Sequence, residues 1–156
     1  MSVSIPVYRL QLIRDANWRT VSKHIQGPQD VVGILATYFE YLDREHFVVL
    51  SLDTKGRATG MHTVAIGTLD QVAAHPREVF KYAVLMNAAS LIAAHNHPSG
   101  DPTPSAEDRT LTRRLTQAGN ILGIPLLDHV IFGDSGTFTS LSDHPVRTGS
   151  YAADFR

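Results

Sequence analysis

The stretch AAHNHPSGDPTPSAED, residues 93–108, holds residue types that can bind a metal ion. It contains two histidines one residue apart, His95 and His97, and an aspartate, Asp108, after a loop. Side chains alternate between the two faces of a strand, so the two imidazoles of a strand that ends here share one face. Two imidazoles on one face can chelate a metal ion without a special backbone. The spacing therefore indicates a metal site at the end of a strand.

Asp108 continues the apolar stripe of a predicted helix. The members of that stripe recur at helical spacing: Leu111, Leu115, Ala118 and Leu122. Asp108 lies one helical step before the first of them, so its carboxylate is expected to face the core. A buried carboxylate needs a positively charged partner. A divalent cation held by the two histidines would supply that partner.

Two imidazoles and one carboxylate form a ligand set that catalytic zinc sites use, with a fourth position left for water. Zinc lowers the pKa of such a water toward ~7 and makes hydroxide available at neutral pH. Ser105 shares the helix face of Asp108, and its hydroxyl could donate a hydrogen bond to an oxyanion near the metal. The same two residues also fit a capping box, and Thr103-Pro104 offers another helix cap. A polar loop with a helix cap is therefore the alternative to a metal site.

The composition of the 156-residue chain fits one domain with a core, because 43% of the residues are hydrophobic and 19% are charged. The formal net charge of −1 gives no general basic field for nucleic acid. Without cysteine, disulfides, thiolate metal sites and cysteine nucleophiles are excluded. No signal peptide and no run of ~18 apolar residues is found, so we expect a cytoplasmic protein with no membrane partner.

Hydrophobic periodicity predicts helices that alternate with strands along the chain. Strands are expected over 7–13, 46–52, 57–66, 90–97, 124–133 and 137–141. Helices are expected over 28–42, from Pro76 onward, and over 105–122 with Gly123 after the last turn. Because 46–52 and 57–66 form a hairpin-like pair within this alternation, we predict an α/β fold with a mixed β-sheet flanked by helices.

The pattern His95-x-His97-Pro98, six residues, Ser105-x-x-Asp108 matches the motif of the JAMM metalloproteases, also called MPN-plus domains. The segments around it resemble the RadC family: HFVVLSLDTKG, IGTLDQVAAHPREVFKYAV, NAASLIAAHNHPSGDPTPSAED and LTRRLTQAGNILGIPLLDHVIFGD. The resemblance covers residues 28–141. It implies the JAMM/MPN architecture, which is cytidine-deaminase-like.

The resemblance also implies a Zn²⁺ site with three ligands: His95, His97 and Asp108. In this family the motif serine, here Ser105, helps to stabilise the tetrahedral intermediate. A glutamate just before an early apolar strand is the general base, and Glu45 matches it. From the residues alone, Glu45 is a solvated carboxylate at the start of a strand, and Glu40 and Asp43 are neighbours that could be confused with it.

Three parts are expected along the chain: an N-terminal extension with a short strand at 1–27, the RadC-like JAMM/MPN domain at 28–141, and a flexible C-terminal tail at 142–156. Longer RadC proteins carry an N-terminal helix-hairpin-helix region associated with DNA, and residues 1–27 show no such repeat. The family's association with DNA repair thus loses its most direct support here. The chain resembles the short RadC-like proteins of bacterial and mobile-element genomes.

Three functions are compatible with these residues. The first is a zinc-dependent metallohydrolase that cleaves a peptide or isopeptide bond of an unidentified peptide or protein substrate, linked to DNA repair or mobile-element biology. The second is a non-catalytic, DNA-repair-associated binding module with a metal site. The third is a metal-dependent nuclease, which ranks last because two-metal phosphodiester chemistry usually needs more clustered carboxylates. Ser105 and Glu45 favour the first, whereas direct nucleic-acid binding and homo-oligomer formation stay open.

Several other polar residues are weaker candidates. Asp128 and His129 point to opposite sides of an apolar strand, so a core histidine is favoured over participation in the site. Asp101 could replace Asp108 as a ligand, but it lies on no helical stripe. Three arginines lie off the apolar stripe of the predicted helix and are expected to face solvent rather than an acidic partner: Arg109, Arg113 and Arg114.

Overall fold

The computed structural model describes residues 3–67, 74–142 and 148–150. Its regular elements follow in the order α1 (Pro28–Phe39), β1 (His46–Leu52), β2 (Ala58–Ile66), α2 (Pro76–Leu85), β3 (Ser90–Asn96), α3 (Ala106–Leu122), β4 (Leu126–Phe132), β5 (Thr137–Ser140) and β6 (Thr148–Ser150). No helix in these residues is long and apolar enough to span a membrane.

The strands form one six-stranded sheet in the order β2-β1-β3-β4-β5-β6. β3 and β4 are parallel and are joined through α3, whereas each of the other neighbouring pairs is antiparallel. A parallel pair needs a crossover connection, and α3 provides it. The predicted α/β fold with a mixed sheet is therefore confirmed.

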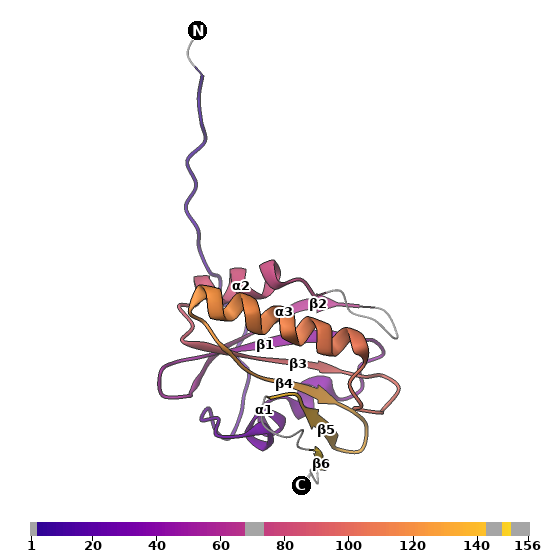
Figure 1. Ribbon diagram of the computed structural model, residues 1–156. Coiled ribbons are helices and arrows are strands. Elements are labelled where there is room, and N and C mark those ends of the chain that lie inside the picture. The colour runs from indigo at the N-terminus through magenta and orange to yellow at the C-terminus, as the bar shows by residue number, and fades with distance from the viewer. Residues whose placement is uncertain (1–2, 68–73, 143–147, 151–156) are drawn as a thin grey trace.

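Helices cover both faces of the sheet: α1 lies on one face, and α2 and α3 lie on the other (Figure 1). Each face has its own buried cluster. On the α1 face, Leu35 and Phe39 pack with Val48, Ile92 and other strand residues. The cluster on the opposite face includes Phe47, Val79, Phe80, Leu91 and Leu115. Strand residues thus alternate between two cores, which places successive side chains of β3 in different surroundings.

Local sequence determines where the helices begin and end. The Asp30 carboxylate accepts hydrogen bonds from the backbone amides of Gln26 and Gly27 at 2.7 and 3.1 Å, just ahead of α1. α3 ends at Gly123, whose φ of 70° lies in the left-handed region that favours glycine.

The structure differs from the sequence prediction at three places. The strand expected at 7–13 is wrong: these residues are exposed and extend away from the domain (Figure 1), and no strand within 3–67, 74–142 and 148–150 pairs with them. Leu122 is 49% exposed and lies outside the core stripe. Ile124 and Leu126 pack instead against the buried cluster on the face covered by α2 and α3. Within the expected C-terminal tail, Thr148–Ser150 forms β6, while 143–147 and 151–156 lie outside the described residues.

Two helical glycines provide a matched test of the packing. A methyl group at Gly33 in α1 would meet no atom within 4 Å, whereas at Gly119 in α3 it would lie 2.5 Å from the carbonyl oxygen of Ile124. We expect Gly33→Ala to raise the free energy of unfolding by about 0.5–1 kcal/mol through helix propensity. Gly119→Ala should lower it by about 1–3 kcal/mol through overpacking. Urea unfolding of the two variants measures both changes, and a change of the same sign in both would contradict the packing described for α3.

Candidate metal centre

Strand pairing and one helix start bring four ionisable side chains together. Phe47 of β1 pairs with His95 of β3, so Glu45, two residues earlier on the same face, lies beside the end of β3. His97 follows β3 directly, and Asp108 lies in the first turn of α3, after the loop. Glu45, His95, His97 and Asp108 each offer one ligand atom, and these atoms lie within 4.8 Å of one another.

The distances among these atoms fit a small metal ion. The Nε2 atoms of His95 and His97 are 3.0 Å apart. Asp108 places Oδ1 3.1 Å from His95 Nε2 and Oδ2 3.3 Å from His97 Nε2. Donors ~2.0–2.1 Å from a tetrahedral zinc ion are about 3.3–3.4 Å from one another. The three residues are thus already near the spacing that zinc requires.

Glu45 lies slightly farther from the two histidines. Its Oε1 is 3.4 Å from His95 Nε2 and 3.9 Å from His97 Nε2. The side chain is buried, with 5% of the residue exposed. Glu45 can therefore act either as a fourth ligand or as a base beside the other three.

The hydrogen bond of His97 determines which ring nitrogen faces the cluster. His97 Nδ1 lies 2.8 Å from the carbonyl oxygen of Asp101. A carbonyl oxygen only accepts, so Nδ1 carries a hydrogen and donates it. In the neutral ring, the lone pair is then on Nε2, the atom that faces Asp108.

A chain of hydrogen bonds likewise determines which ring nitrogen of His95 faces the cluster. Thr112 Oγ1 donates to the Asp108 carbonyl oxygen at 2.7 Å, so it accepts from His129 Nδ1 at 2.7 Å. Burial, reinforced by His95, lowers the pKa of His129 well below its usual value, and the ring is neutral. His129 Nε2 therefore accepts from His95 Nδ1 at 2.8 Å. His95 Nε2 keeps its lone pair for a metal, as in the outer-shell contacts that orient metal-binding histidines.

Charge is balanced within the cluster. Burial raises the pKa of Asp108, but its contacts with the imidazoles of His95 and His97 and with the Ser105 amide outweigh burial and hold that pKa well below its usual range. For His97, burial lowers the pKa, but Asp108, the Asp101 carbonyl and Glu45 raise it above the ordinary value. Without a metal, a proton on an imidazole thus supplies the positive charge that the carboxylates require.

Asn96 faces the other side of the sheet and fixes the backbone around Glu45. Its Oδ1 accepts from the His46 amide at 2.8 Å, and its Nδ2 donates to the Arg44 carbonyl at 3.0 Å. These groups belong to the two peptide units that flank Glu45. One side chain of β3 therefore positions the glutamate, while the next one on each side is a histidine of the cluster.

Ser105 adopts the capping-box arrangement that was one of its two interpretations. Its Oγ accepts from the Asp108 amide at 3.0 Å, and its own amide donates to Asp108 Oδ2 at 2.7 Å. The first contact uses the oxygen as an acceptor and leaves the hydroxyl hydrogen for another acceptor. Capping is thus compatible with the predicted role of Ser105 in catalysis, which stays a prediction.

The structure places the carboxylates of Asp101 and Asp128 outside the cluster, whereas His129 contacts it through His95. The Asp101 carboxylate bonds Thr103, and it is the Asp101 carbonyl that contacts His97. The Ser140 hydroxyl donates one hydrogen bond that is shared by the two carboxylate oxygens of Asp128, at 2.9 and 2.7 Å, on the face away from His129. The sequence favours an ordinary core position for His129, but the structure places its ring against His95. Neither Thr112 nor Asn96 is predicted from the sequence to support the site. The apolar surroundings of His129 were the available signal, but its partner depends on strand register.

The fold and this cluster define an α/β domain with a group of side chains that could hold a metal ion. Residues 25–146 match the family model described as RadC-like JAB domain. The chain belongs to that family, which confirms the resemblance seen in its sequence.

Relatives agree with this assignment. A UPF0758 protein of Moorella thermoacetica is 56% identical over 119 residues, which cover 76% of this chain and 52% of that protein. One of Desulforamulus reducens is 54% identical over 117 residues, covering 75% and 51%. This chain thus spans about half the length of these relatives. A solution structure of protein DSY2949 from Desulfitobacterium hafniense aligns with a TM-score of 0.39 and 18% identity over 78% of this chain and 86% of that one.

The contact between His129 and Thr112 can be tested without disturbing a ligand. Thr112→Val keeps the side-chain shape but removes the hydroxyl that accepts from His129, so His95 is less firmly held in the binding tautomer. We expect the affinity for Zn²⁺ to fall on the order of 10-fold. Competition with a chromophoric chelator measures it. Thr116→Val is the matched control, because Thr116 Oγ1 bonds only the Thr112 carbonyl, one turn further along α3. Equal affinities in the two variants would contradict the relay.

The raised pKa of His97 gives metal binding a definite pH dependence. The protonated form of His97 is favoured in the metal-free protein, so a metal ion must displace that proton. Affinity for Zn²⁺ should therefore rise with pH across the range in which His97 loses its proton, above the ordinary 6.5. Titrations at several pH values, corrected for the competing chelator, measure this. An affinity that does not change with pH in this range would contradict the assignment of His97 as a ligand.

Proposed function

We propose that the chain is a zinc-dependent metallohydrolase that cleaves a peptide or isopeptide bond in a protein or peptide substrate. The observation that carries this proposal is the near-tetrahedral spacing of the Nε2 atoms of His95 and His97 and the Asp108 carboxylate. The buried Glu45 carboxylate beside them adds a base. Zinc held here would supply a Lewis acid and make water a nucleophile at neutral pH.

Residues of the chain perform the other catalytic roles. Glu45 accepts the proton of the attacking water on its carboxylate and passes it to the leaving amine. Ser105 donates its hydroxyl hydrogen to the oxyanion that forms on the substrate carbonyl. Asp108 and the two histidines keep their positions through the contacts to the Ser105 amide, Asp101 and His129.

A two-metal nuclease is less well supported. Such sites hold a pair of metal ions between clustered carboxylates. Within the described ranges, one group of potential metal ligands is found, and it contains two carboxylates, those of Glu45 and Asp108.

Glu45→Gln tests the proposal most directly. Glutamine keeps the shape but cannot accept the proton, so hydrolysis should fall on the order of 10²–10⁴-fold while zinc stays bound. Mass spectrometry of a library of peptides and lysine-linked isopeptides, incubated with zinc-loaded protein, detects cleavage, and elemental analysis measures the zinc. Asp43→Asn is the matched control, because Asp43 is an exposed carboxylate two residues away, outside the cluster.

The result that contradicts the mechanism is a substrate cleaved equally fast by the wild type and the Glu45→Gln variant. In that case the metal site serves a different chemistry or binding alone.

A further inference from the structure

A cleft of about 590 Å³ opens beside the candidate metal centre. Its walls come from three places: the end of α1 with the loop after it, the loop that follows β3, and the turn between β4 and β5. His97 lines it and is the one residue of the metal cluster in its lining, so the cleft meets the cluster at His97, whereas Asn96 lines it from the α1 side of the sheet. The volume lies within the range of roughly 300–1,000 Å³ that is typical of ligand pockets. A substrate backbone held at the cluster can therefore place a neighbouring side chain in this cleft.

The floor of the cleft is apolar. Phe39 of α1 and Phe132 of β4 are both buried and both line the cleft, with ring centroids 4.6 Å apart. Ala36 and Leu42 extend the same surface. Such a floor suits an aliphatic chain rather than a short polar group.

The rim, in contrast, carries negative charge. Glu40 is half-buried and Asp134 is exposed, and the lining contains neither lysine nor arginine. Among the described residues, neither carboxylate forms an ion pair within 4.0 Å. The nearby Asp43 differs, because Arg44 Nε lies 2.8 Å from its carboxylate. The cleft thus presents two carboxylates that lack an ion-pair partner among the described residues, and that of Glu40 is hydrogen-bonded to the Tyr41 hydroxyl.

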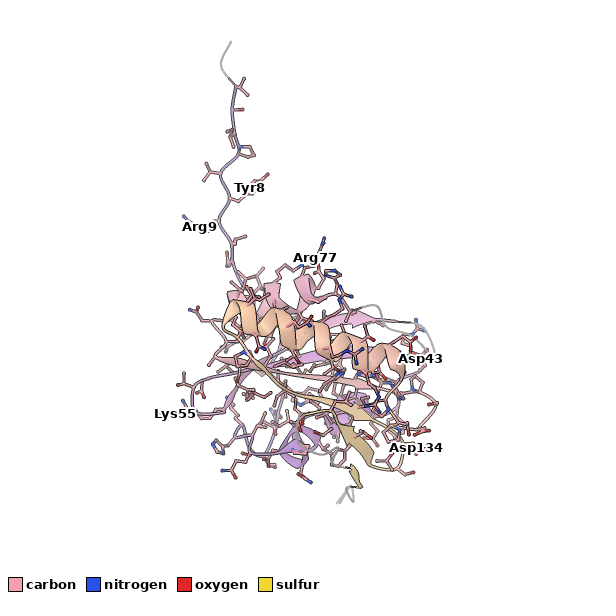
Figure 2. The ribbon with its side chains drawn as sticks, viewed as in Figure 1. Tyr8, Arg9, Asp43, Lys55, Arg77 and Asp134 are labelled. Carbon is pink, nitrogen blue, oxygen red and sulfur yellow. The ribbon has the colours of Figure 1, made fainter. Side chains whose placement is uncertain are left out.

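The Asp134 carboxylate is held against the loop that carries His97. The Asp134 amide donates to the Gly100 carbonyl at 2.9 Å, and the Gly100 amide donates to the His97 carbonyl at 2.9 Å. Gly100 has a φ of 85°, and a Cβ there would lie 2.6 Å from Asp134 Oδ2. Figure 2 shows Asp134 at the same end of the sheet as Asp43 and opposite Lys55. The contacts with Gly100 therefore fix the position of Asp134 at the rim of the cleft.

Of the three described non-glycine residues with positive φ, two line the same cleft, and the third, Asn87, lies elsewhere. Tyr41 has a φ of 62° and Ser135 a φ of 49°, and both line the cleft. Non-glycine residues in this region cost free energy, and they occur preferentially at ligand-binding surfaces. Tyr41 is also 95% exposed, so its conformation is not explained by burial of the ring.

We propose that this cleft binds a lysine or arginine side chain of the substrate, next to the bond that is cleaved. The aliphatic part of that side chain lies on the floor formed by Phe39 and Phe132, and its charged end pairs with Glu40 and Asp134. This assignment rests on the proposed hydrolase function, because it takes the substrate backbone to lie at the metal cluster. The substrate class is then a protein segment with a basic residue beside the scissile bond.

The test measures binding, so it needs neither metal nor turnover. N-acetyl-lysine N-methylamide and its norleucine counterpart, which has the same stem without the charge, are titrated into the ¹⁵N-labelled full chain. We expect the lysine probe to shift amide resonances of Gly100 and of 133–136, with an affinity about three- to tenfold above that of norleucine. Asp134→Asn and Glu40→Gln should each reduce this preference, and both together should remove it. Asp43→Asn is the control that should leave it unchanged.

Two results would overturn the proposal: equal affinities for the two probes, or shifts that lie outside the cleft. The variants keep side-chain shape, and their amide spectra report directly whether they fold. Failure of the hydrolase proposal is distinguishable from these results. If no peptide is cleaved, the lysine preference in the cleft is still measured. If peptides are cleaved without preference for a basic residue, the hydrolase stands and the cleft assignment is wrong.

Discussion

Two buried carboxylates that share one imidazole nitrogen are the constraint on which this structure depends. Glu45 Oε1 and Asp108 Oδ1 lie 3.4 and 3.1 Å from His95 Nε2, and burial penalises both negative charges. A metal ion or a proton must therefore reside among them. The hydrogen bonds that His97 Nδ1 donates to the Asp101 carbonyl and that His95 Nδ1 donates to His129 Nε2 direct two lone pairs toward that position. These contacts leave both Nε2 atoms able to bind a metal ion.

Much of the site could be predicted because its signals are local. The alternation of a strand places His95 and His97 on one side, and helical periodicity places Asp108 toward the core. Both inferences need only neighbouring residues. The mixed sheet followed in the same way, from helices that alternate with strands and from one hairpin-like pair.

The features that the residues alone did not show depend on strand register. Glu45 precedes His95 by fifty residues and reaches it because β1 pairs with β3, which the residues alone did not show. Alternation correctly separated Asp128 from His129, but the pairing of β3 with β4 decides which of them meets His95. The alternating segment 7–13 failed in the opposite sense: its pattern fits a strand, but the described residues contain no neighbour for it. Alternating apolar and polar residues indicate that a segment has two different faces, but the segment forms a β-strand only when a neighbouring strand pairs with it.

The crossover from β3 through α3 to β4 has a consequence for folding. Asp108 and Thr112 come from the crossover helix, and His129 comes from the strand after it. Glu45 directly precedes β1, far earlier in the chain. No contiguous fragment contains the whole set in position, so a metal ion held by these residues would bind the native state far better than the unfolded chain. Thermodynamic linkage then makes the ion a stabiliser: at free concentrations 100 times Kd it adds ~2.7 kcal/mol. For this small domain, the free metal concentration would therefore affect the free energy of unfolding as well as any reaction at the site.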